Sequence, residues 1–322
     1  FIMPLNNAEE CAVVKNSNIY AFSNLKDVAK FLVKPDKFPY KLKKLVKYRK
    51  MDMLDYSDVY GQESSKRAIE VAAAGGHNLA LIGPPGCGKS MMAKRIISIL
   101  PKMSYDEALE VTKIYSVSGK IGEKKGIMYD RPFRSPHHTS TLVSIIGGGV
   151  NLLPGEVSLA HNGVLFLDEM LEFKRSILEV LRQPLEDKCI KISRASGSVT
   201  YPANFMLVAA LNPCPCGYFN SNVRACTCSE FERRRYLGKF SGPLLDRFDI
   251  FSYVNYVKPN DFDGNVKREP SKCIRRRVVS ARKIQRERYK HEKIYTNSQM
   301  DEEQIKKYCK LDKDSKMLLN AI

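Results

Sequence analysis

LALIGPPGCGKS, residues 79–90, is the stretch that decides the fold of this chain. Its apolar start, residues 79–82, predicts a buried strand, and residues 91–97 after it have the apolar spacing of a helix. Between them lies the pattern G-x-x-x-x-G-K-S, whose fixed residues are Gly83, Gly88, Lys89 and Ser90. An ordinary glycine turn is the alternative, but the order of strand, loop and helix favours a phosphate-binding loop.

This loop predicts a site for ATP and Mg²⁺. Glycines let backbone N–H groups approach phosphate oxygens, and the N-terminus of the following helix adds the positive end of its dipole. Lys89 would supply a positive charge for the β- and γ-phosphates, and Ser90 a hydroxyl ligand for Mg²⁺. The residues expected to contact the nucleotide are Gly83, Pro84, Pro85, Gly86, Cys87, Gly88, Lys89, Ser90 and Met91.

A second apolar run, residues 164–167, predicts a buried strand that ends in Asp168 and Glu169. After a phosphate loop, such a carboxylate pair indicates hydrolysis: Asp168 would hold Mg²⁺ through water, and Glu169 would act as the general base on the attacking water. The alternative is that Asp168 caps the helix predicted over 174–181. The two roles are compatible, and the phosphate loop favours the catalytic one.

A third apolar strand is predicted over 204–211, with Asn212 at its end. Ligands of open α/β sheets lie at the carboxyl ends of the strands. We therefore expect Asn212 at the same edge as the phosphate loop and the carboxylate pair, where its amide would orient water near the γ-phosphate.

Residues 116–156 are rich in glycine, and we expect loops there, with a short helix over 139–146 and a turn at 147–149. The pair His137 and His138 has no third metal ligand at helical spacing, so a structural or substrate-facing role is expected. Further helices are predicted within 23–32, 57–74, 104–114, 271–289 and 299–311.

Four cysteines lie close together in the sequence: Cys214, Cys216, Cys226 and Cys228. Four thiols flanked by Pro and Gly can form a tetrahedral Zn²⁺ site. Each pair encloses a single residue, whereas common zinc ribbons have two or more, so free thiols are an equal alternative.

Alternating residues and a central turn predict a hairpin over 188–202, with Lys191 and Arg194 on its arm or tip. Further along, Arg247 follows a short apolar run near the end of the predicted nucleotide module. An arginine there would reach the γ-phosphate of a neighbouring subunit. The alternative is an ion pair with Asp246 or Asp249.

The chain has 322 residues and a formal net charge of +18. This excess favours a polyanionic partner such as DNA, although a lysine-rich proteome would also produce it. Nine cysteines without a secretory context indicate a reducing cytoplasm, and no apolar run is long enough to span a membrane. The chain begins with Phe1 and ends inside a predicted helix, so we expect it to be part of a longer protein.

Composition suggests four segments. Residues 1–33 would be the end of a preceding domain, and the basic residues 34–56 a linker. Residues 57–257 would be the nucleotide-binding core, with a four-cysteine insertion at 214–228, and residues 258–322 the start of a helical lid.

Together these motifs resemble the Mg-chelatase-like AAA+ ATPases of the bacterial ComM/YifB family over nearly the whole chain. The stretches that carry the resemblance are FRSPHHTSTLVSIIGGG (133–149), PGEVSLAHNGVLFLDE (154–169), LRQPLED (181–187), NPCPCGY (212–218) and SGPLLDRFD (241–249).

The resemblance implies an α/β AAA+ P-loop fold, with a parallel sheet between helices and a helical lid, assembled as a hexamer with ATP at each interface. Residues 117–157 resemble the helix-2 insert and 188–202 the pre-sensor-1 hairpin, both of which face the pore of the ring. Asn212 resembles sensor 1 and Arg247 the arginine finger. Residues 1–33 resemble the end of a Lon-protease-like domain, but no Ser/Lys dyad can be placed, so we expect no protease activity.

Three functions follow as hypotheses. The family is similar to branch-migration helicases, which predicts an ATP-driven motor on single-stranded or branched DNA during recombination and natural transformation. The alternative is a magnesium-chelatase-type subunit that remodels a protein partner, although the basic charge and the cysteine pairs argue against it. A non-enzymatic scaffold is disfavoured because Lys89, Glu169 and Arg247 are all present.

Overall fold

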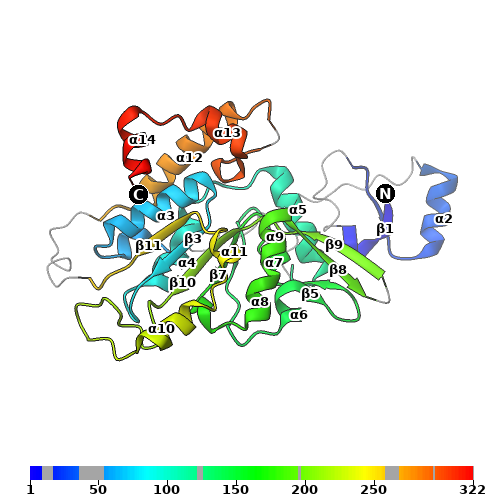
Figure 1. Cartoon of the computed structure of the whole chain (residues 1–322). Helices are drawn as coiled ribbons and strands as arrows, with labels where there is room; N and C mark the ends of the chain where they lie inside the picture. The colour runs from blue at the N-terminus through cyan, green and yellow to red at the C-terminus, as the bar shows by residue number, and fades with distance from the viewer. Residues whose placement is uncertain are drawn as a thin grey trace. The chain divides into compact units, whose positions relative to one another are not determined.

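The computed structural model describes residues 1–8, 17–35, 54–121, 126–194, 197–257, 268–292 and 294–321. Figure 1 labels helices and strands of the chain. The chain divides into two compact units. The first comprises residues 1–54, 102–208 and 237–244, and the second residues 55–101, 209–236 and 245–322. The predicted basic linker falls mostly on residues 36–53, which lie outside the described ranges, as do hairpin residues 195–196.

In the second unit, the predicted strand and helix around the phosphate loop are confirmed. Strand β3 is Leu79–Ile82, and helix α4 is Lys89–Ile99. Strand β11, Ile250–Tyr253, pairs with β3 in parallel, with Ile250 opposite Leu79. Strand β11 was not predicted, because alternate residues of it are exposed and no continuous apolar run marks it.

In the first unit, β7, Val164–Leu167, is completely buried, and the two-residue strand β4, Phe133–Arg134, pairs with it in parallel. Strand β10, Met206–Leu211, is also buried along its whole length, and its residues divide between the units. The strand order is β11-β3-β10-β7-β4. The prediction of an α/β fold with a parallel sheet is confirmed.

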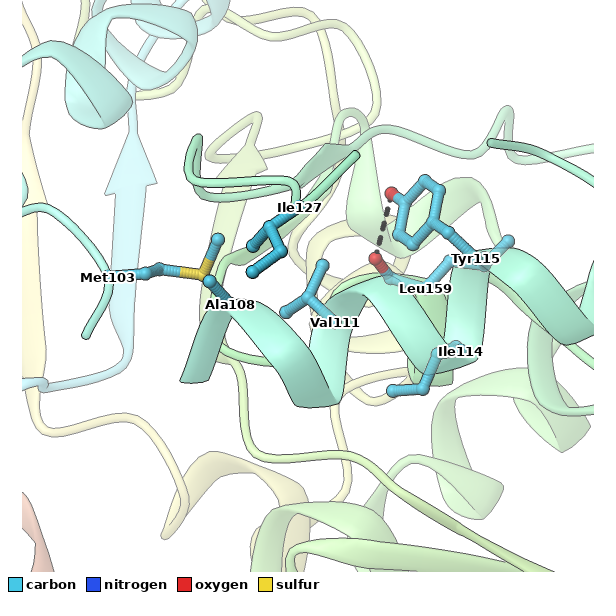
Figure 2. Close-up of a cluster of buried hydrophobic side chains, with 7 residues drawn as sticks. All are labelled: Met103, Ala108, Val111, Ile114, Tyr115, Ile127 and Leu159. Carbon is cyan, nitrogen blue, oxygen red and sulfur yellow. Dashed lines mark hydrogen bonds between the residues drawn. The ribbon is translucent and has the colours of Figure 1, made fainter. Parts of the chain in front are cut away.

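One cluster of buried hydrophobic side chains in the first unit lies where α5, Tyr105–Val117, packs beside α7, Glu156–Leu159 (Figure 2). A capping box begins α5, since the Ser104 and Glu107 side chains each accept a hydrogen bond from the other residue's backbone N–H group. The hydroxyl of Tyr115 donates to the carbonyl of Leu159 at 3.0 Å. This packing fixes the segment that leads into β7. The clustered side chains are Met103, Ala108, Val111, Ile114, Tyr115, Ile127 and Leu159.

The predicted hairpin is also confirmed in this unit, as β8, Cys189–Arg194, and β9, Gly197–Pro202. The turn expected at 147–149 differs: the first two glycines form β5, Gly147–Gly148, which pairs with β6, Leu153–Pro154. A Cβ atom on Gly147 would lie 2.8 Å from Ile192 Cδ1. The glycines therefore allow the ribbon to pack closely against the hairpin.

The remaining elements include predicted helices and others that were not predicted. No helix in the described part of the chain is long and apolar enough to cross a membrane. At the N-terminus, β1, Ile2–Pro4, pairs in parallel with β2, Tyr20–Phe22. The other helices of the first unit are α2, Leu25–Val33, α6, Leu142–Ile146, α8, Arg175–Val180, α9, Arg182–Asp187, and α11, Gly242–Leu245, which reaches the boundary. Those of the second are α3, Glu63–Gly75, α10, Glu230–Leu237, α12, Ser271–Arg288, α13, Glu302–Tyr308, and α14, Lys313–Asn320. Of these elements, α2, α3, α6, α8, α12 and α13 were predicted, whereas β1, β2, α9, α10, α11 and α14 were not.

An ion-pair network joins α12 to α3. The guanidinium of Arg277 donates to both carboxylate oxygens of Glu70, at 2.6 and 2.9 Å, and also bonds Glu269. The side chain of Glu70 is only 9% exposed. Hydrogen bonds from Arg277 lower the pKa of Glu70, although burial opposes this.

We predict that Glu70→Gln lowers the free energy of unfolding by about 1–3 kcal/mol, because it replaces the carboxylate of a part-buried bidentate pair by a neutral amide whose NH₂ group cannot accept from Arg277. Since folding lowers the pKa of Glu70, this stabilisation is complete above the unfolded-state pKa. It is lost as the pH falls through the folded-state value. Urea unfolding at pH 7 and at lower pH values measures both effects.

The matched control is Glu287→Gln, because Glu287 pairs with Lys290 in an exposed pair within one helical turn. This substitution should change stability by less than about 0.5 kcal/mol. Equal effects of the two substitutions would contradict a stabilising role for the Glu70 pair.

Candidate active site

The phosphate loop joins β3 to α4 within the second unit. Gly86 and Gly88 have φ values of 76° and 94°, which glycine adopts without strain. Gly88 is the N-cap of α4, and Lys89 is the first helical residue. The predicted strand–loop–helix context is therefore present.

The ammonium group of Lys89 lies inside this loop, and the residue is 8% exposed. Its Nζ donates to the carbonyls of Gly83 at 2.7 Å and Pro84 at 2.8 Å. It also donates to Asn212 Oδ1 at 3.1 Å. A buried ammonium requires such acceptors, and a phosphate oxygen can take the place of one of them.

Asn212 thus meets the phosphate loop, as its position after β10 predicted. Its Oδ1 accepts a hydrogen bond from Lys89 Nζ, and its NH₂ group can donate hydrogen bonds to other partners. The interaction with Lys89 itself was not predicted. A role for the amide in orienting water stays a prediction.

Two residues that were not predicted hold the loop from outside. The Gln62 side chain donates to the carbonyl of Cys87 at 3.4 Å and also bonds the carbonyl of Asn255. The hydroxyl of Tyr256 donates to the carbonyl of Pro85 at 2.9 Å. Neither residue belongs to a recognisable motif, so only the folded structure reveals them.

The carboxylate pair follows β7 in the first unit. Asp168 Oδ1 accepts from the backbone N–H of Glu169 at 3.1 Å. Glu169 has a left-handed φ of 49°, which is uncommon for a residue with a side chain and typical of functional sites. The N-cap of α8 is Lys174, so the alternative in which Asp168 caps that helix is wrong.

His138 lies beside Glu169 in the same unit: its Nδ1 is 3.6 Å from Glu169 Oε2. The pairing of β4 with β7, in which Arg134 lies opposite Leu165, brings the segments that follow the two strands to the same edge of the sheet. The His138 ring also meets the ring of His137, with centroids 4.1 Å apart, and the edge of Phe173. His138 therefore lies next to the predicted general base, and the sequence pattern did not indicate this contact.

Arg247 lies at the other end of β3 from the phosphate loop. Its backbone carbonyl accepts from the side chain of Asn78, the residue before β3, at 2.8 Å. Asp249 accepts from the backbone N–H of Asn78 at 2.9 Å. Strand β3, which rises about 3.3 Å per residue, therefore lies between Arg247 and the phosphate loop of the same chain.

The two basic residues predicted for nucleic acid lie on the hairpin, but on opposite faces of β8. Lys191 is exposed opposite Thr200, whereas Arg194 shares the face of the buried Ile190 and Ile192. The period of two along a strand explains this separation.

The four predicted zinc ligands come together in the second unit, with all four sulfur atoms within 4.8 Å of one another. Burial opposes ionisation of Cys216. The backbone N–H groups of Tyr218 and Thr227 nevertheless lower the pKa of its thiol to about 5. These hydrogen bonds favour the thiolate of Cys216, and thiolates are the form of cysteine that binds metals.

Comparison with known families agrees with the predicted motifs. The family described as "Magnesium chelatase, subunit ChlI" matches residues 55–262, which is more than half of the chain. The family described as "Magnesium chelatase, subunit ChlI C-terminal" matches residues 268–322.

Individual relatives agree with these families. The chain is 46% identical over 268 residues to Uncharacterized protein YifB of Escherichia coli, covering 83% of this chain and 52% of the relative. It is 40% identical over 328 residues to Competence protein ComM of Haemophilus influenzae, covering 100% and 63%. The Holliday junction branch migration complex subunit RuvB of Pediococcus pentosaceus is 26% identical over 215 residues, covering 65% and 48%. The chain thus spans about half to two thirds of the length of YifB and ComM.

We predict that His138→Ala lowers kcat for ATP hydrolysis by roughly tenfold, because Glu169 loses the ring beside its carboxylate. KM for ATP should hardly change, since His138 lies beside Glu169, whose expected role is in the chemical step and not in binding ATP. Steady-state kinetics separates the two parameters, and His138→Asn, which keeps a hydrogen-bonding group, should restore part of kcat.

His291→Ala is the control, because His291 is an exposed histidine of the other unit. An unchanged kcat in His138→Ala, or an equal loss in His291→Ala, would show that the contact with Glu169 has no role in hydrolysis.

Proposed function

The chain belongs to the magnesium chelatase subunit ChlI family, and on this premise we propose that it is the ATPase part of a motor that acts on DNA. The observation that supports this most is the burial of Lys89 inside a complete phosphate loop, in contact with Asn212. Both are side chains that a triphosphate site needs.

Each residue has a role in this proposal. Lys89 exchanges a loop carbonyl for a phosphate oxygen, and Ser90 and Asp168 hold Mg²⁺. Bound Mg²⁺ neutralises phosphate charge. Glu169 accepts a proton from the attacking water while His138 positions its carboxylate, and Asn212 donates from its amide. Zinc at the cysteine cluster is a separate inference, since hydrolysis does not require it.

Arg247 acts on a neighbouring copy in this proposal. Its backbone is anchored at Asn78, the far end of β3, so it is remote from the phosphates of its own chain. An arginine in this position stabilises the charge on a γ-phosphate when a second copy presents it. This supports a ring, for which a hexamer is the arrangement that the family resemblance implies.

DNA is the polyanion that we propose as the substrate. The net charge of +18 favours such a partner. Lys191 is exposed on the hairpin and available to a phosphate backbone. The relative named for Holliday junction branch migration and the one named as a competence protein support the same choice.

The family description itself supports a second candidate, an ATPase subunit that remodels a protein partner of the magnesium chelatase type. In that case ATP hydrolysis would respond to the partner and not to DNA. The same assay therefore distinguishes the two.

We predict that the full-length protein hydrolyses ATP faster with single-stranded or branched DNA. Glu169→Gln should lower the rate in both conditions by roughly 10²-fold or more, because the general base is lost. The measurement is phosphate release with and without each DNA. Hydrolysis that ignores DNA would instead favour the protein-remodelling candidate.

Lys191→Glu tests the hairpin in the same assay. It should reduce DNA stimulation and leave the basal rate unchanged, and the stimulation should weaken steeply as salt rises. Lys290→Glu, an exposed lysine of the other unit, is the matched control. Equal losses from the two variants would show that charge, and not the hairpin, determines the response.

A further inference from the structure

Four sulfur atoms in the segment after β10 have the spacing of ligands around one metal ion. The Sγ atom of Cys214 is 3.3 Å from that of Cys216 and 3.7 Å from that of Cys226, and the latter two are 3.6 Å apart. Zinc–sulfur bonds of about 2.3 Å in a tetrahedron place sulfur atoms roughly 3.8 Å apart. A disulfide requires about 2.0 Å, and all four thiols are free.

We propose that Cys214, Cys216, Cys226 and Cys228 bind one structural Zn²⁺, and that this ion increases nucleotide affinity by fixing the segment after β10 against the phosphate loop. The clause on affinity rests on the proposed function, whereas the metal site does not. Four thiolate ligands leave no open position, which indicates a structural ion.

Backbone groups around the cluster fit thiolate ligands. The N–H of Cys216 donates to Cys228 Sγ at 3.3 Å, and the N–H of Phe219 donates to Cys214 Sγ at 3.3 Å. Such outer hydrogen bonds orient metal ligands and offset their charge. Arg233 of α10 adds a hydrogen bond to the carbonyl of Cys228 at 2.9 Å and lies over the ring of Phe219. The loop that carries the thiols is therefore fixed to the following helix.

Two contacts connect the cluster to the phosphate loop within the second unit. Asn212, which bonds Lys89, lies two residues before Cys214. Gly217 lies between the two cysteine pairs, and a Cβ atom there would be 2.5 Å from Pro85 Cδ. An ion that holds the cysteines thus also fixes Asn212 and the tip of the loop. Without the ion, both contacts belong to a segment that is held by β10 at one end and by the bond of Arg233 to Cys228 at the other, with no metal bond between its two cysteine pairs.

The test combines metal analysis with nucleotide binding on the full-length protein. Elemental analysis after exhaustive dialysis should find roughly one zinc per chain in the wild type and in Cys309→Ser, an exposed cysteine outside the cluster. Cys226→Ser/Cys228→Ser should lose it. Removing zinc from the wild type with a chelator should raise the Kd for a fluorescent ATP analogue by roughly tenfold. Adding zinc back should restore the Kd.

Gly217→Ala separates the two clauses without removing a ligand. It should keep zinc, since all four thiols remain, and still weaken nucleotide binding, because the methyl group meets Pro85 and the φ of 85° disfavours a side chain. Absence of zinc, iron in its place, or a disulfide between the cysteines would overturn the metal assignment. Bound zinc with an unchanged Kd after chelation would overturn the link to the loop. Zinc-loaded protein that binds no nucleotide would instead refute the proposed function and leave the metal site standing.

Discussion

The burial of one positive charge, the ammonium group of Lys89, is the constraint around which the nucleotide site is built. An uncompensated buried charge costs several kcal/mol, so the surrounding loop has to present acceptors to it. The carbonyls of Gly83 and Pro84 and the side chain of Asn212 meet that need. The turn that brings these carbonyls inward includes Gly86 and Gly88, both with positive φ. A triphosphate can replace these acceptors because it offers the same kind of oxygen with more charge.

Segments far apart in the sequence converge on this loop inside one unit. Gln62 reaches it from the start of α3, Tyr256 from the residues after β11, and Gly217 from the cysteine segment. Each contact is made to the backbone or the proline ring of the loop and not to a group that chemistry would use. They can therefore fix the shape of the loop without competing with a nucleotide. One of them, the contact of Gly217 with Pro85, can be altered by removing metal from the neighbouring cysteine cluster.

How much the sequence predicts depends on how local the signal is. Strands β3 and β7 are continuous apolar runs followed by glycine or carboxylate motifs, so they and their site residues were found. Strand β11 was missed because it is half exposed, and β4 because it has only two residues. The contact between His138 and Glu169 depends on the pairing of β4 with β7, which no local pattern encodes. Strand periodicity alone predicts that Lys191 and Arg194 lie on opposite faces of their strand. The residues opposite them become known only from the pairing of β8 with β9.

The central claim is that the loop holding Lys89 binds a nucleoside triphosphate, and equilibrium binding of a fluorescent ATP analogue in the presence of Mg²⁺ tests it most directly. The comparison is Lys89→Ala against Lys94→Ala, which removes an exposed lysine from the same helix. Lys89→Ala should raise the Kd by at least roughly tenfold, whereas Lys94→Ala should bind as the wild type does. Equal affinity of wild type and Lys89→Ala would contradict the claim.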